Sequence, residues 1–174
     1  VAPAYISQFG DDVTPGKFKT ALQVLGFSDV HEVAFGADVG AISEAHHYAK
    51  EVATCNLPFL LTSCCPSWSM MAKKFFPTMI DNISQELTPM VLTGRMIKKD
   101  HPDCKVVFIG PCAAKKLEAS RRSVRSDVDF VLTFEELDAM FDAREIDPAS
   151  FEEDGSLHDA TAAGRGYAVA GGVA

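Results

Sequence analysis

The chain has 174 residues, of which 47% are hydrophobic and 23% charged, a composition typical of a folded globular protein and unlike a disordered or fibrous one. This length suits one domain and leaves little room for a second. No stretch reaches the roughly 18 apolar residues of a membrane span, and the first residues do not resemble a signal peptide, so we expect a cytoplasmic protein. The net charge of −8 argues against nucleic acid as a partner, because phosphate binding needs clustered cations.

The charges are unevenly distributed along the chain. Residues 62–126 hold eleven Lys and Arg against five Asp and Glu, whereas residues 127–159 hold twelve acidic residues against one Arg. A basic centre would favour an anionic cofactor, although solvated helix faces would give the same pattern. The missing initiator Met and the abrupt Gly-rich ending indicate a piece of a longer polypeptide.

The predicted elements alternate between helix and strand. We expect helices over 15–25, 38–53, 66–75, 88–99 and 133–144, and short strands over 31–35, 58–62, 105–109 and 129–132. Boundary signals include the first-turn proline after Thr14, the stop at Gly26, and the capping box formed by Thr133 and Glu136. The helix over 38–53 carries Ile42, Ala45, Ala49 and Val52 on one face.

Alternation of this kind is typical of an α/β fold, a parallel sheet flanked by helices on both faces. After Asp147 the pattern decays into a stretch rich in Gly and Asp. We therefore expect residues 1–146 to form the core and residues 147–174 to form an irregular linker.

Cysteines follow two of the predicted strands. Cys64 and Cys65 come directly after 58–62, and Cys112 follows 105–109. Because parallel strands end at the same edge of a sheet, both loops are expected to open where α/β folds bind their ligands. Pro66 lies where a helix would begin, and the unpaired N–H groups and the helix dipole there favour thiolate, the form that binds iron.

The cysteines do not form a complete ligand set. A 4Fe-4S cluster needs about four ligands, and only Cys65 and Cys112 lie on converging loops. Zinc would also need about four N or S donors, and no suitable Cys or His pair lies beside them. Packing is the alternative for any free cysteine, and it is the preferred interpretation of Cys55 and Cys104. Five cysteines without a disulfide framework fit a reducing compartment.

Two segments around these cysteines are distinctive. They are Thr62-Ser63-Cys64-Cys65-Pro66-Ser67-Trp68 and Pro111-Cys112-Ala113-Ala114-Lys115-Lys116-Leu117-Glu118. Together they resemble the first two H-cluster signatures of iron-only (FeFe) hydrogenases, and the similarity extends through nearly the whole chain. The resemblance implies that residues 1–174 form a partial H-cluster domain, one lobe of the two-lobed FeFe-hydrogenase catalytic domain, without the third cysteine signature.

The resemblance implies a ligand role for two cysteines. In that family the H-cluster is a 4Fe-4S cubane joined through a cysteine to a two-iron subsite with carbon monoxide, cyanide and a bridging dithiolate. Four cysteines hold it. Cys65 and Cys112 would be two of the cubane ligands, and the other two would lie beyond Ala174. Lys115 resembles the lysine that contacts a cyanide ligand, a charge-assisted contact, with a solvated lysine as the alternative.

The resemblance also implies residues that line the two-iron subsite. They are Pro3, Ala4, Thr88, Met90 and Pro111. Ala4 replaces a serine of the prototype, Met90 lies where a glutamine is common, and Gly110 replaces the methionine of the second signature. Such departures would tune redox potential and access to the cluster.

Four residues are implied in proton transfer. Cys64 resembles the family's proton donor to the bridgehead amine, a role open to a thiol that is not metal-bound, with packing as the alternative. Glu44 and Ser84 match members of the family's proton pathway. His47 lies where the prototype has a second glutamate and would keep a group that titrates near neutral pH, unless it is an ordinary helix histidine.

These expectations combine into one hypothesis with two alternatives. The parent protein would interconvert dihydrogen with protons and electrons, with ferredoxin or attached iron–sulfur domains as electron partner, and would need hydrogenase maturation proteins and the missing C-terminal lobe. The isolated chain would be inactive and could lack the cluster. The alternatives are a hydrogen- or redox-sensing regulatory module and a non-catalytic iron–sulfur relative that carries or assembles cubanes.

Overall fold

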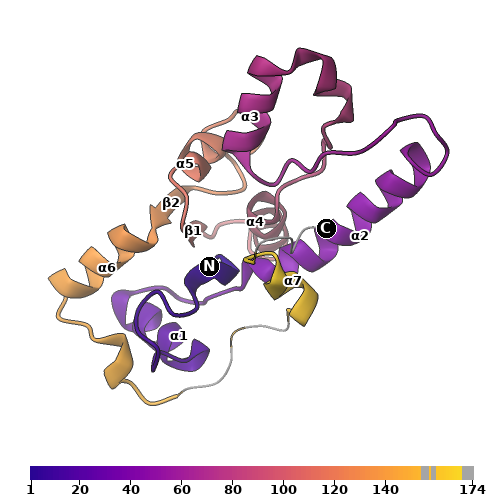
Figure 1. The fold of residues 1–174 in the computed structure, drawn as a ribbon. Helices are drawn as coiled ribbons and strands as arrows, with labels where there is room; N and C mark the ends of the chain where they lie inside the picture. The colour runs from indigo at the N-terminus through magenta and orange to yellow at the C-terminus, as the bar shows by residue number, and fades with distance from the viewer. Residues whose placement is uncertain (154–156, 158–159, 170–174) are drawn as a thin grey trace.

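The computed structural model describes residues 1–153, 157 and 160–169, and Figure 1 shows helices arranged around a small sheet. The α-helices are α1 (Pro15–Leu25), α2 (Val33–Glu51), α3 (Pro66–Phe75), α4 (Pro89–Asp100), α5 (Ala114–Ala119), α6 (Phe134–Ala143) and α7 (Ala162–Gly166). The strands are β1 (Val107–Gly110) and β2 (Phe130–Thr133), and three 3₁₀ turns are η1 (Pro3–Tyr5), η2 (Pro77–Asn82) and η3 (Pro148–Ser150). Among the described residues, no helix has both the length and the hydropathy of a membrane span.

The sheet is parallel, which confirms the predicted α/β class. Strand β1 pairs with β2 in a register that runs from Val107 opposite Phe130 to Gly110 opposite Thr133. The N-terminal segment lies along β1 as well, since the Ala2 N–H donates to the Ile109 carbonyl at 2.8 Å. Both strands lie within two residues of their predicted bounds, and their carboxyl ends lead into the segments that precede α5 and α6.

Two predicted strands are wrong. Residues 58–62 form only an isolated parallel bridge between Leu61 and Ile83, because the residues just before Ile83 belong to η2 and offer no extended partner to residues 58–60. Residues 31–35 run into α2, which begins at Val33 after that residue's N–H has bonded to the Val1 carbonyl. Helices α2 and α4 pack closely at this point, because a Cβ on Gly36 would overlap the Thr93 side chain of α4.

The second half of α2 carries an unexpected exposed face. Ile42 is 63% exposed, and Ala45 and Ala49 are also exposed, so the apolar face predicted for this helix does not enter the core. Figure 1 shows this half of the helix projecting away from the sheet. Its less exposed side carries Glu44 and His47 instead. The polar side of α2 is therefore the side that neighbours the rest of the chain.

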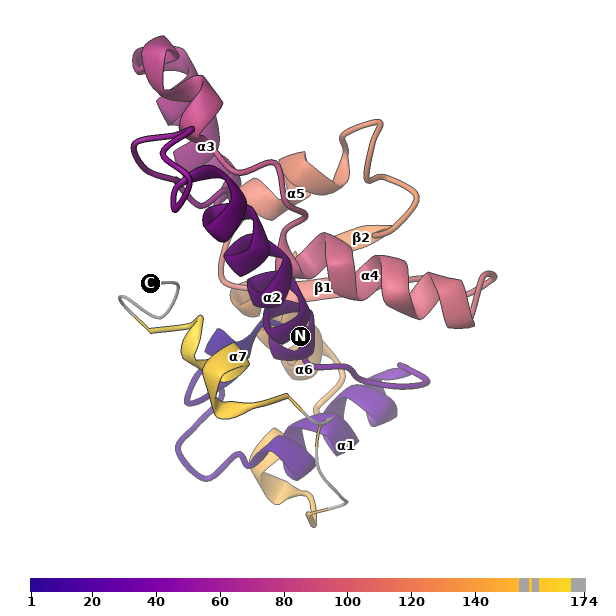
Figure 2. The same ribbon diagram turned by 90° about the vertical axis from the view of Figure 1, so that its right-hand side faces the viewer.

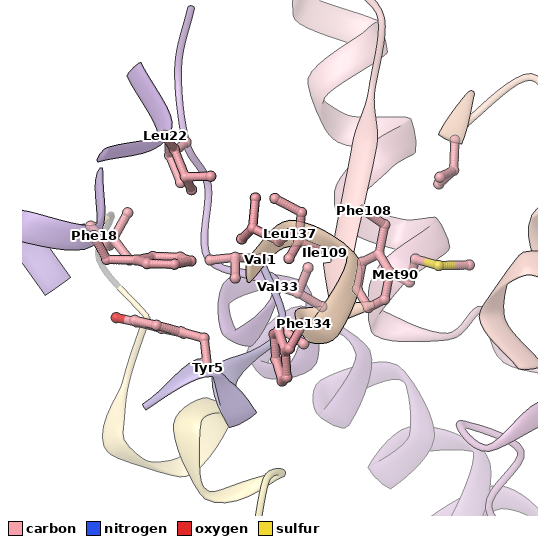
Figure 3. Packing of buried hydrophobic residues seen from close by; sticks show 14 of the residues in the cluster. Val1, Tyr5, Phe18, Leu22, Val33, Met90, Phe108, Ile109, Phe134 and Leu137 are labelled. Atoms are coloured by element: carbon pink, nitrogen blue, oxygen red, sulfur yellow. The ribbon is translucent and has the colours of Figure 1, made fainter. Parts of the chain in front are cut away.

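The core lies between the sheet, α1 and α6. Figure 3 shows Leu137 of α6 beside Ile109 of β1, with Val1 between these residues and Phe18 and Leu22 of α1. Phe18 is fully buried, and its ring stacks on Tyr5 with the centroids 4.9 Å apart. Burial of large apolar side chains is the main source of stability for such a lobe.

The linker predicted over 147–174 is not wholly irregular. It contains η3 and the short helix α7, which packs against α2 in Figures 1 and 2. Residues 154–156, 158–159 and 170–174 lie outside the described part of the chain.

The capping box predicted for the helix after β2 is present. The Thr133 hydroxyl accepts from the Glu136 N–H at 3.3 Å, and the Glu136 carboxylate accepts from the Thr133 N–H at 2.9 Å. Thr133→Ala is expected to lower the free energy of unfolding by about 1 kcal/mol, because the N–H of Glu136 loses its partner. Urea denaturation would measure this, with Thr78→Ala at an exposed position of η2 as the control. Equal midpoints for the two variants would contradict the prediction.

Candidate metal centre

The first cysteine loop presents a thiol at the start of a helix. Cys65 caps α3, and its Sγ accepts a hydrogen bond from the Trp68 N–H at 3.5 Å. The Trp68 indole N–H donates to the Thr62 carbonyl at 2.9 Å and so ties the loop to the helix. Cys65 is exposed. The expected placement of a thiol at a helix N-terminus is therefore confirmed, and such a position favours thiolate.

The second cysteine loop meets the first. Cys112 is half-buried two residues after the end of β1, and its carbonyl accepts from the Lys115 N–H at 3.1 Å. The Lys115 ammonium crosses to the other loop and donates to the Cys64 carbonyl at 2.9 Å. It also pairs with the buried carboxylate of Glu118 at 2.8 Å. One lysine therefore joins the Cys64–Cys65 loop to the Cys112 loop, although only the Cys112 loop follows a strand of the β1–β2 sheet.

The donors fit half of a four-cysteine iron–sulfur site. Cys65 and Cys112 lie on the joined loops, and within the described ranges no three His, Cys, Asp or Glu side chains gather in a way that could hold a metal ion. The other cysteines are elsewhere: Cys104 lines a mainly apolar pocket, and Cys55 is exposed, which contradicts the packing role expected for it. A cubane bound here would need further ligands from outside the described residues.

Cys64 and Glu44 line one small pocket. Gly40 and Glu44 of α2 form one side of it, and Ser63 and Cys64 form another. Burial raises the pKa of the half-buried Cys64 thiol, with a Thr62 hydrogen bond and the Lys115 charge acting in the opposite direction. A thiol with a raised pKa keeps its proton at neutral pH. Cys64 can therefore serve as a proton donor.

The other residues assigned to proton transfer lie outside this pocket. His47 is half-buried on α2, one helical turn beyond Glu44. Ser84 is 1% exposed; its N–H donates to the Leu61 carbonyl at 2.8 Å, and its hydroxyl accepts from the Glu86 N–H at 3.2 Å. These contacts give Ser84 a structural role, and a proton-transfer role for either residue stays a prediction.

The residues assigned to the subsite lining are spread over several elements. Pro3 and Ala4 are half-buried in η1 beside the end of β1, and Pro111 is exposed next to Cys112. Thr88 is buried and caps α4, its hydroxyl accepting from the Val91 N–H at 3.5 Å. Met90 is 2% exposed; Figure 3 draws it within the core, and it borders the same apolar pocket as Cys104. Contact of these residues with a cofactor stays a prediction.

Tyr167 is a site residue that the sequence did not reveal. It follows α7 and lines the pocket of Cys64 and Glu44. Burial raises the pKa of its phenol, and the charges of Glu44, Cys64 and Asp38 act in the same direction. No local pattern in a Gly-rich tail marks this tyrosine. Only the packing of α7 on α2 brings it to the site.

The described residues define the class of this chain: an α/β domain in which Lys115 joins two cysteine loops. The chain matches the family described as iron only hydrogenase large subunit, C-terminal domain, over residues 1–174. It is 35% identical to Iron hydrogenase 1 from Clostridium pasteurianum, over 95% of this chain and 31% of that protein. The chain belongs to the iron-only hydrogenase large-subunit family.

Two further similarities bear on function. A solved structure of a variant of the FeFe-hydrogenase HydA1 from Chlamydomonas reinhardtii superposes with a TM-score of 0.79 at 28% identity, covering 95% of this chain and 47% of that one. The cytosolic Fe-S cluster assembly factor NAR1 from Kluyveromyces lactis is 35% identical over 67% of this chain and 25% of that protein. The chain thus spans less than half of the length of each of these relatives.

Proposed function

We propose that the protein containing this chain is a hydrogenase that interconverts dihydrogen with protons and electrons, and that this chain supplies part of the cluster shell. The observation that carries the proposal is the Lys115 bridge to the Cys64 carbonyl, which joins both cysteine loops next to a pocket holding a carboxylate and a thiol. Ligand thiols and a proton donor on adjacent residues are what such a reaction needs.

The cysteines and Lys115 would hold the cofactor. Cys65 and Cys112 would ligate a 4Fe-4S cubane, with the two remaining ligands from a second lobe. An ammonium has three N–H donors, and Lys115 uses two of them on Cys64 and Glu118. The third could reach an anionic cyanide ligand, a charge-assisted contact. The subsite lining would come from Pro3, Ala4, Thr88, Met90 and Pro111.

Protons would pass between Glu44 and Cys64. Both groups border one pocket, and the Cys64 thiol stays protonated at neutral pH because burial raises its pKa. Ser84 and His47 would extend the route toward solvent. When bound, the H-cluster supplies the redox chemistry of dihydrogen, while the chain's own groups deliver and remove protons.

The proposal includes partners outside this chain. Electrons would come from ferredoxin or from attached iron–sulfur domains, and hydrogenase maturation proteins would insert the two-iron subsite. The free thiols of the described residues support a reducing, cytoplasmic compartment.

Anaerobic maturation of the full-length protein tests this function. We expect cyanide and carbonyl infrared bands together with hydrogen uptake or evolution, and neither from the 174-residue chain alone. A full-length protein with bound iron but without bands and without activity would exclude a hydrogenase.

A non-catalytic iron–sulfur relative is the second candidate. The similarity to an Fe-S cluster assembly factor favours it, as do the departures at Gly110 and Met90 from the hydrogenase prototype. It predicts cubane iron without the infrared bands, so the same experiment separates the two candidates.

A further inference from the structure

A tyrosine from far along the chain completes the pocket of Glu44 and Cys64. Besides residues of α2 and of the Cys64 loop, the pocket is lined by Glu86, Leu87, Pro89 and Tyr167. Tyr167 is half-buried. A carboxyl, a thiol and a phenol from three separate segments thus border one small space, which Ser63 and Glu86 also line.

The pocket is sized for a single hydrogen-bonded bridge. It has space for about one water molecule, and an enclosed water typically makes about three hydrogen bonds. Glu44, Cys64 and Tyr167 are three of the polar residues that line it, beside Ser63 and Glu86. A phenol is a useful third partner, because it can donate to a carboxylate or water and accept from one.

Helix α7 holds Tyr167 in place through several contacts with α2 and the segment before it. The Thr161 N–H donates to the Asp38 carboxylate at 2.8 Å, and the Arg165 guanidinium bonds both oxygens of the buried Glu32, at 3.2 and 2.9 Å. Gly164 sits so close to α2 that a Cβ there would lie 2.7 Å from the Asp38 carboxyl carbon. These contacts leave α7 little freedom to move, and Tyr167 directly follows it.

We propose that Tyr167 is a positioning residue for proton transfer, its hydroxyl orienting the bridge between Glu44 and Cys64. The proposal rests on the hydrogenase function. In the transfer, a proton that Cys64 has given up is replaced from Glu44 through the water, while Tyr167 keeps its own proton. The raised pKa of the phenol supports this role, because Tyr167 then remains a donor across the working pH range.

The hydroxyl can be removed without changing the packing. In the matured full-length protein, Tyr167→Phe is expected to slow hydrogen evolution roughly tenfold and to raise the solvent deuterium isotope effect, because a misplaced bridge makes proton transfer limiting. The matched control is Tyr48→Phe, which removes an exposed phenol from α2 outside the pocket and is expected to leave both quantities unchanged. A Tyr167→Phe enzyme with wild-type rate and isotope effect overturns the proposal.

A second measurement does not depend on hydrogenase activity. The pKa of the Tyr167 phenol is obtained from ultraviolet absorbance, as the difference between the titration curves of wild type and Tyr167→Phe. The same difference is measured again with Glu44→Gln present in both proteins. The groups that face it are Glu44, Cys64, Asp38 and the pocket-lining Glu86. Removing the Glu44 charge is expected to lower the pKa of Tyr167, whereas Glu51→Gln, further along α2, is expected to leave it unchanged. If Glu44→Gln leaves the pKa of Tyr167 unchanged, the two side chains do not share a pocket and the proposal is wrong. This result holds whether or not the protein is a hydrogenase.

Discussion

Cys64→Ala is expected to abolish hydrogen turnover in the matured full-length protein while leaving the iron content near that of wild type. The Cys64 thiol borders the same pocket as Glu44, and its neighbour Cys65 presents the thiol that caps α3. Removing the proton donor without touching a ligand would cost at least about a hundredfold in rate, the usual contribution of a positioned acid or base.

The comparison with other cysteine variants makes this prediction specific. Cys65→Ala is expected to lose both iron and activity, because it removes one of the two cubane ligands that we propose for this chain. Cys55→Ala, at an exposed position outside both loops, is expected to retain both. Hydrogen evolution and iron content are measured on all three. A Cys64→Ala enzyme at the wild-type rate would remove Cys64 from the mechanism, and a loss of iron from it would indicate a structural role instead.

Local sequence signals predicted those helix ends that are fixed by residues within one turn of the helix. Thr14 caps α1 and Gly26 ends it in the left-handed conformation, as its position after the apolar run indicates. The capping box at Thr133 likewise fixes the start of α6. These signals succeed because each is satisfied by residues within one turn of the helix.

The errors come from elements whose structure depends on distant partners. Residues 31–35 have the apolar character of a strand, yet Gly36 lets the chain pack as a helix against α4. Residues 58–62 look like a buried strand, but only Leu61 finds an extended neighbour. Hydrophobic pattern alone does not distinguish such short apolar runs.

In the candidate site, too, the features that depend on neighbouring residues could be predicted, whereas those that depend on distant residues could not. The Cys112 loop could be predicted from the end of β1, and the place of Cys65 at the start of α3 from Pro66, although the strand predicted before Cys64 does not form. The Lys115 bond to the Cys64 carbonyl could not, since it joins residues 51 positions apart. Tyr167 reaches the pocket only through α7, whose docking on α2 depends on Glu32, Asp38 and Gly164.

Arg165→Ala is expected to lower the free energy of unfolding by about 2 to 3 kcal/mol, because it leaves the carboxylate of Glu32 buried without its two guanidinium hydrogen bonds. Glu32 is only 3% exposed, whereas the Arg165 side chain is half exposed, so the cost falls on the carboxylate. Urea denaturation gives the value, with the exposed Arg122→Ala as the control.

A double variant separates the ion pair from the packing of α7. Glu32→Gln removes the carboxylate charge that Arg165→Ala would leave buried without a partner. Arg165→Ala is therefore expected to lower the free energy of unfolding clearly less in a Glu32→Gln background than in wild type. Equal costs in the two backgrounds would mean that Arg165 stabilises the fold through its aliphatic stem. The expected coupling would instead show that the Glu32–Arg165 ion pair holds α7 against α2. The same ion pair would then keep the phenol of Tyr167 at the pocket of Cys64.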